Sequence, residues 1–161
     1  MQRLYLSLDP SQASTGWAII GVAKRTPRFV AGGFIDTKTA NNPLRSIRQE
    51  VQRLLQTYPI ERSVAKERMF YRNNLATLAL AKVHGVIEEV LDGYDVFDIP
   101  SSTVRKIVGG HGCASKDLVA SGVRRLLGLP RTFVFDRWDI SDAASVGITY
   151  LYQAGLIDIP A

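Results

Sequence analysis

The sequence has few of the residues that carry disulfide, zinc or thiol chemistry. Its 161 residues include one cysteine, Cys113, and two histidines. One cysteine cannot form a disulfide within the chain, and so few Cys and His side chains give no cluster with zinc-ligand spacing. There is also no convincing Ser/His/Asp or Cys/His arrangement, no GxxxxGKS/T loop and no GxGxxG fingerprint. These absences argue against a side-chain nucleophile and against the common nucleotide-binding loops.

Long apolar runs are absent as well. No stretch approaches the roughly 18 apolar residues that a membrane span requires. The first eight residues also lack the charged and apolar regions of a secretory signal. We therefore expect a cytoplasmic protein with no membrane association.

The composition is that of a folded, basic protein. Apolar residues make up 46% and charged residues 22% of the chain, and its length suits a single domain over 1–161. Lysine and arginine number 20 against 15 acids, a net charge of +5. Residues 101–138 hold seven cations and two acids, so this segment alone accounts for the excess. Such a segment favours a polyanionic partner such as nucleic acid, although solvated helix faces would give the same pattern.

The order of predicted elements is typical of an α/β protein. Apolar alternation predicts strands, apolar residues at helical spacing predict helices, and proline or glycine separates them. The predicted strands span 4–8, 16–22, 28–35, 63–70 and 94–99, and the predicted helices span 43–58, 74–91, 101–108, 116–127 and a last segment from near Asp139. This order predicts a mixed five-stranded sheet with helices on both faces. The 74–91 helix has an apolar stripe wider than one core contact requires, which predicts a second contact surface.

Four acids occupy positions where an isolated carboxylate is costly to bury. Asp9 ends the first strand, Glu67 lies in the fourth, and Asp139 and Asp142 share one face of the last helix. Three of them have a simpler explanation: a turn at Asp9, an ion pair at Glu67 and helix capping at Asp139. If all four converge, their oxygens would form a site for Mg²⁺ or Mn²⁺. Two such ions can drive hydrolysis of a phosphodiester by water.

Four collinear segments resemble the RuvC family of Holliday-junction resolvases. They are 8–18 (LDP to TGWA), 67–70 (ERMF), 110–116 (GHGCASK) and 139–144 (DISDAA). The resemblance covers nearly the whole chain and implies a ribonuclease H-like fold and crossover junction endodeoxyribonuclease activity. It includes viral members of the family, so a viral origin and a cellular one both stay open. It also implies a homodimer that nicks two opposing strands of a four-way junction, or of other branched DNA, with two Mg²⁺ or Mn²⁺ ions per active site. The residues that match the catalytic, metal-binding acids of the family are Asp9, Glu67, Asp139 and Asp142.

The resemblance further implies contacts with DNA. Phe70 matches an aromatic residue that stacks on a base near the junction centre, and outside the family context it would be a core aromatic at a strand end. Arg105 and Lys116 match basic positions near the scissile phosphate, although the neighbouring Lys106 competes with Arg105 for that role. The full set of candidate DNA contacts is Phe70, Arg72, Arg105, Lys106, Lys116 and Arg124.

The 74–91 helix falls where the family forms its dimer interface, which would explain its wide apolar stripe. Two other functions stay open. A junction-binding recombination scaffold that does not cut would keep the fold and the basic surface, but the intact acids argue against it. A phosphotransferase of the actin-like ATPase type shares the strand order and an early aspartate, but it needs a second domain, for which 161 residues leave little room.

Overall fold

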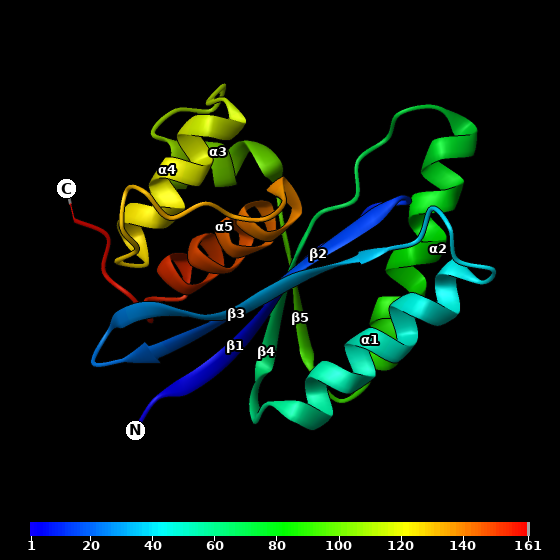
Figure 1. The fold of residues 1–161 in the computed structure, drawn as a ribbon, viewed down its shortest axis with the longest axis horizontal. Coiled ribbons are helices and arrows are strands. Elements are labelled where there is room, and N and C mark those ends of the chain that lie inside the picture. Colours follow the sequence, from blue (N-terminus) through cyan, green and yellow to red (C-terminus); the bar gives the residue numbers. More distant parts are fainter. Residues whose placement is uncertain (161) are drawn as a thin grey trace.

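Five strands form one mixed sheet in the computed structural model, which describes residues 1–160 (Figure 1). The strands are β1 (Arg3–Asp9), β2 (Ser14–Ala23), β3 (Thr26–Asp36), β4 (Ile60–Glu67) and β5 (Asp95–Ile99), in the spatial order β3-β2-β1-β4-β5. Antiparallel pairs join β1 to β2 and β2 to β3, while parallel pairs join β1 to β4 and β4 to β5. The expected mixed five-stranded sheet is therefore confirmed.

The strand pairing brings two distant carboxylates to one edge of the sheet. Leu8 pairs with Lys66 in the parallel β1–β4 ladder. Asp9 follows Leu8 on β1, and Glu67 follows Lys66 on β4. On its other side, Asp9 pairs with Gly16 of β2. Because parallel strands run in the same direction, their carboxyl ends lie at a common edge. Asp9 and Glu67 therefore become neighbours in space.

Helices cover both faces of the sheet (Figure 1). They are α1 (Pro43–Thr57), α2 (Asn74–Val90), α3 (Ser101–Gly109), α4 (Lys116–Leu126) and α5 (Trp138–Gln153). Helices α1 and α2 pack on one face, and α5 packs on the other with α3 and α4 beside it. A hydrophobic core lies on each face of the sheet, and alternate residues of β2 point into one or the other. Ile19 packs on the α1 and α2 side, and Ile20 packs on the α5 side. No helix within residues 1–160 is both long enough and apolar enough to cross a membrane.

Helix α5 packs closely enough on the sheet to be almost entirely buried. From Ile140 to Leu151 every residue except Asp142 is buried. Small residues make this contact possible, since a Cβ on Gly147 would collide with Ser7 and with the side chain of Ile20. The one residue of this run that is only partly buried is a carboxylate, which indicates a role other than packing.

The fourth strand differs from its predicted position. The sequence predicts a strand over 63–70, but β4 spans Ile60–Glu67. After Glu67 one further backbone hydrogen bond follows, from the Arg68 N–H to the Ile99 carbonyl, and the chain then leaves the sheet. The prediction that Phe70 lies in a strand is therefore wrong: it lies in the loop that follows, and its side chain is 43% exposed.

The start of the last helix also differs from the capping expectation. Helix α5 begins at Trp138, the N-cap position belongs to Arg137, and no side chain accepts a capping hydrogen bond there. Asp139 lies within the first turn instead. Helix capping therefore does not account for Asp139, whose carboxylate pairs with Arg137.

Candidate active site

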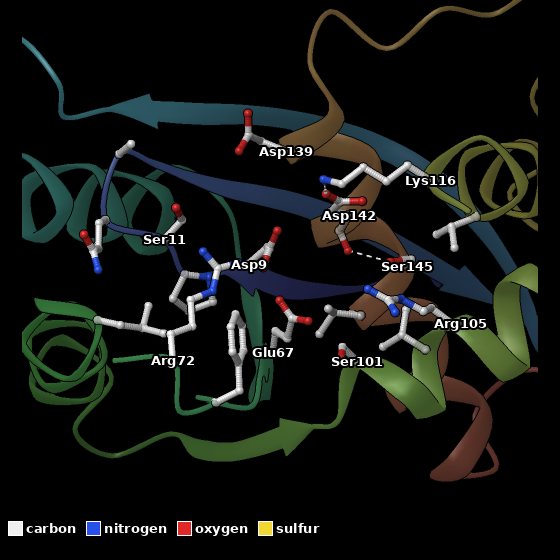
Figure 2. A pocket seen from close by; sticks show the side chains of 18 of the residues that line it. Asp9, Ser11, Glu67, Arg72, Ser101, Arg105, Lys116, Asp139, Asp142 and Ser145 are labelled. Carbon is white, nitrogen blue, oxygen red and sulfur yellow. Dashed lines mark hydrogen bonds and ion pairs between the residues drawn. The ribbon is translucent and has the colours of Figure 1, made fainter. Parts of the chain in front are cut away.

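A cavity of about 980 Å³ opens at the edge of the sheet where β1 and β4 end (Figure 2). Its walls come from the ends of these strands, the loops that follow them, α2, α3, the first turn of α4 and the N-terminal half of α5. All four predicted acids line it: Asp9, Glu67, Asp139 and Asp142. Four of the six candidate DNA contacts line it too: Phe70, Arg72, Arg105 and Lys116. Residues scattered along the sequence therefore share one concave surface.

Asp9 and Glu67 form the part of the site that belongs to the sheet. Burial, a hydrogen bond with Glu67 and the charges of Glu67 and Asp142 raise the pKa of the Asp9 carboxyl well above its ordinary value. The charge of Lys116 opposes this shift only in part. Burial is the largest cause of the shift, and repulsion among the ionised carboxylates adds to it. A divalent cation would take the place of the proton and remove that repulsion.

Asp139 and Asp142 approach the same space from α5, and each is paired with a cation. The Lys116 Nζ donates to Asp142 Oδ2 at 2.8 Å, and the Arg137 Nε donates to Asp139 Oδ2 at 3.2 Å. Burial raises the pKa of Asp142, and the Lys116 hydrogen bond opposes that shift without cancelling it. Partial burial lowers the pKa of the Lys116 ammonium, but the hydrogen bond to Asp142 and the nearby carboxylates outweigh it, so the net shift is upward.

Gly16 allows α5 to come this close to the sheet. A Cβ on Gly16 would overlap the carbonyl group of Asp139, and these are backbone atoms that no rotamer change can move. Gly16 is also the residue that pairs with Asp9 across the β1–β2 ladder. The absence of a side chain at one position therefore sets the approach of Asp139 toward Asp9.

The candidate DNA contacts fall into two groups. Phe70 and Arg72 lie in the loop between β4 and α2, where the Arg72 guanidinium carbon is 5.0 Å from the centroid of the Phe70 ring. Across the cavity, Arg105 projects from α3 (Figure 2). The neighbouring Lys106 is exposed but does not line the cavity. Arg124 does not line it either: its Nη1 donates to the Phe133 carbonyl at 3.4 Å.

Two cations without a role predicted from the sequence are neighbours of the acids, Arg137 in space and Lys66 along the chain. Arg137 pairs with Asp139, and its guanidinium carbon lies 4.4 Å from the centroid of the Phe34 ring. Lys66 immediately precedes Glu67 and has a side chain that is only 2% exposed. The two-residue spacing from Arg137 to Asp139 could have indicated that ion pair. No local pattern indicates the other contacts, because their partners lie far away in the sequence.

Lys66 is the centre of a second group of titratable residues, on the α2 side of β4. Its Nζ lies 2.7 Å from His84 Nδ1 and 3.1 Å from Glu88 Oε1, and it forms an ion pair with Asp98. His84, Glu88 and Asp98 are close enough together to hold a metal ion. The Lys66 ammonium, however, already supplies the positive charge between them. Burial and the charge of Lys66 lower the pKa of His84, so its neutral ring accepts the ammonium hydrogen.

Comparisons with curated proteins identify a single family. The family model described as "Crossover junction endodeoxyribonuclease RuvC" matches residues 5–150. A relative of that name from Acidiphilium cryptum (strain JF-5) is 34% identical over 153 residues, which cover 92% of this chain and 90% of the relative. Another from Rickettsia massiliae (strain Mtu5) is 27% identical over 153 residues, with coverage of 92% and 96%. These relatives are bacterial, so they do not support the viral alternative that the sequence analysis left open.

Solved structures share the fold. The structure described as "T. thermophilus RuvC in complex with Holliday junction substrate" matches with a TM-score of 0.82 at 24% identity, and the match covers 94% of each chain. The fowlpox virus Holliday junction resolvase matches with a TM-score of 0.61 at 14% identity, with coverage of 93% and 99%. The expected ribonuclease H-like arrangement is therefore confirmed.

Proposed function

Because this chain belongs to the RuvC family of crossover junction endodeoxyribonucleases, we propose that it resolves four-way DNA junctions with a metal centre formed by Asp9, Glu67, Asp139 and Asp142. The observation that carries this proposal is the convergence of the four carboxylates in one cavity. The assignment of residues 1–161 to one nuclease domain is part of the same proposal.

The donor set of the cavity fits a pair of hard divalent cations. All four candidate ligands are carboxylates, without a thiol or imidazole among them, which suits Mg²⁺ or Mn²⁺ better than zinc. Burial, and after it the neighbouring carboxylates, raise the pKa of Asp9, and a bound divalent cation would favour its ionised form against both. When bound, two such ions would activate a water molecule and stabilise the leaving oxygen of the phosphodiester.

The residues around the acids would hold and orient the DNA strand. Lys116 and Arg105 offer positive charge on the α3 and α4 side of the cavity, where the scissile phosphate would lie. We infer that Arg105 takes this role in preference to Lys106, because Arg105 lines the cavity. Phe70 is half-exposed beside Arg72 on the opposite wall, and this pair would stack on an unpaired base and contact its phosphate. The expected products carry 5′-phosphate and 3′-hydroxyl ends.

A second copy of the chain would bind on the exposed apolar surface around the start of α2. We define this α2 surface as Tyr71, Leu75 and Leu78, whose exposed fractions are 72%, 81% and 56%. The opposite side of α2 already packs in the core through Val83 and Ile87. The N-terminal half of the helix extends beyond the edge of the sheet, where a partner can reach it (Figure 1). A homodimer through this surface would carry two active sites, one for each nicked strand.

Leu78→Glu is expected to dissociate this homodimer. A carboxylate in the middle of the interface would lose its hydration without a partner, so the dimer dissociation constant should rise by about 100-fold or more. Sedimentation velocity at micromolar concentration measures the change. Leu118→Glu is a matched control, since it alters a 47% exposed leucine on α4. If Leu78→Glu remains as dimeric as Leu118→Glu, the α2 surface is not the interface.

A nicking assay tests the metal centre. A synthetic four-way junction and a linear duplex of the same sequence are incubated with the protein and Mg²⁺, Mn²⁺ or a chelator. We expect paired, symmetric nicks in the junction with either metal and none with the chelator. Glu67→Gln should lower the rate about 1,000-fold, roughly 4 kcal/mol of transition-state stabilisation, and still bind the junction.

Glu61→Gln is the matched control, because Glu61 lies on the same strand but does not line the cavity. It should cut at the wild-type rate. A Glu67→Gln protein that also cuts at the wild-type rate would refute the assignment of the site. A wild-type protein that binds the junction tightly and leaves it intact with both metals would instead be a non-cutting recombination scaffold.

A further inference from the structure

Arg137 occupies a position that helix energetics does not favour. It is the N-cap residue of α5, where a side chain that accepts hydrogen bonds is preferred and where the helix dipole disfavours a cation. Its guanidinium instead makes three contacts with other groups. The Nε donates to Asp139 at 3.2 Å, the Nη2 donates to Ser14 Oγ at 3.4 Å, and the guanidinium carbon lies 4.4 Å from the centroid of the Phe34 ring.

We propose that Arg137 pairs with Asp139 only in the absence of metal. When a divalent cation binds Asp139, the Arg137 guanidinium would leave the carboxylate and bind a DNA phosphate. The inference rests on the proposed metal centre and extends it to a residue outside the cavity wall. In the protein without metal, Arg137 neutralises Asp139 in the way that Lys116 neutralises Asp142. The arrival of a metal ion would then release one cation for the substrate.

The geometry of the ion pair permits this exchange. Arg137 reaches Asp139 through one Nε contact and not through a two-pronged guanidinium–carboxylate pair, and its side chain is 38% exposed. An ion pair of this kind, partly exposed to water, is weak. A guanidinium binds phosphate oxygens well, so a nearby DNA strand offers an alternative partner. The stacking on Phe34 would keep the guanidinium beside the site while its polar partner changes.

The exchange links metal binding to DNA binding. If Arg137 competes with the metal for Asp139, its removal should tighten metal binding by the DNA-free protein. If the released guanidinium contacts a phosphate, its removal should weaken junction binding, and more so when a divalent cation is present. In the wild type the two ligands are then coupled: the metal raises the affinity for DNA by the same factor by which DNA raises the affinity for the metal.

The test compares Arg137→Gln with Arg131→Gln, which removes the same charge from an exposed residue of the preceding loop. Calorimetry with Mn²⁺ on the DNA-free proteins should give about 2- to 5-fold tighter binding for Arg137→Gln only. Junction affinity is then measured with Ca²⁺ and with a chelator over a range of salt concentrations. With Ca²⁺, Arg137→Gln should bind the junction about ten-fold more weakly, and the slope of log affinity against log salt concentration should become shallower by about one unit. With the chelator, both changes should be much smaller. Arg137→Lys keeps the charge but not the planar group, so its junction affinity with Ca²⁺ should lie between those of the wild type and Arg137→Gln.

An unchanged Mn²⁺ affinity in Arg137→Gln, or an equal loss of junction affinity with and without Ca²⁺, would overturn the proposal. Asp139→Asn separates this failure from failure of the metal centre itself. If Asp139→Asn weakens Mn²⁺ binding while Arg137→Gln leaves it unchanged, only the exchange is wrong. If Asp139→Asn also leaves it unchanged, Asp139 is not a metal ligand and both proposals fall.

Discussion

Replacing Asp9 with asparagine should lower the rate of junction nicking by at least about 1,000-fold while making the metal-free protein more stable. The loss of activity follows from the position of Asp9 between Glu67 and the acids of α5, where it would contact both metal ions. An amide is a poor ligand for a hard cation, and several kcal/mol of transition-state stabilisation would disappear with the ions.

The gain in stability follows from the pKa of Asp9. Burial and the neighbouring acids raise this pKa in the folded protein, while the unfolded chain has a value near the ordinary 3.8. Ionisation of Asp9 therefore opposes folding, and the cost grows as the pH rises from the unfolded-chain value through the folded-state value. Asparagine cannot ionise. The free energy of unfolding of Asp9→Asn should exceed that of the wild type at neutral pH, and the difference should vanish in acid below the ordinary pKa.

Denaturant unfolding with a chelator and with Mn²⁺ measures both properties of Asp9→Asn. Mn²⁺ at 100 times its dissociation constant should stabilise the wild type by about 2.7 kcal/mol and the variant by much less. Asp95→Asn is the matched control, since it removes an exposed strand aspartate outside the cavity. Asp9 would not be a ligand if Mn²⁺ stabilised Asp9→Asn as much as it stabilises Asp95→Asn.

The second large effect is expected at Lys66, whose replacement by alanine should lower the free energy of unfolding by about 3 kcal/mol. Lys66 fills buried volume beneath α2, and its ammonium is the shared partner of His84, Glu88 and Asp98. Alanine leaves a cavity and removes the only cation from this group. The two carboxylates are about half-exposed, so they regain hydration, which limits the loss to less than a fully buried pair would cost.

Lys66→Met separates the two contributions. Methionine fills most of the same volume without the charge, so it should restore more than half of the stability that alanine removes. The measurement is denaturant unfolding at neutral pH, with Lys38→Ala as the control for loss of an exposed lysine. Equal losses in Lys66→Met and Lys66→Ala would mean that the charge, and not the filled volume, carries the stabilisation. A Lys66→Ala protein as stable as Lys38→Ala would contradict the structure of this group.

The sequence predicted the sheet and the helices well because periodicity and prolines act locally. The four acids stand out in the sequence at the end of apolar strands and on an apolar helix, but it was the family resemblance, and not the pattern alone, that favoured a joint role over simpler explanations. The limits of β4 were harder to place, because Ile60–Arg62 looks polar and pairs with β1 only through the distant Leu4. Burial of Lys66 depends on α2 and β5, and the contact of Arg137 with Phe34 joins β3 to the start of α5. Such contacts have no local signature.

The order in which the acids occur along the chain has a consequence for synthesis of the protein. Two of the four lie on α5, the last helix along the chain, and this helix must also settle against Gly16 before Asp139 can face Asp9. A growing polypeptide can therefore complete all five strands and the α1–α2 face while it carries only half of the four proposed metal ligands. Cutting becomes possible only after residue 142 has left the ribosome and α5 has docked. With the proposed metal centre, a chain released before α5 is complete would lack two of the four carboxylates and so would not cut DNA.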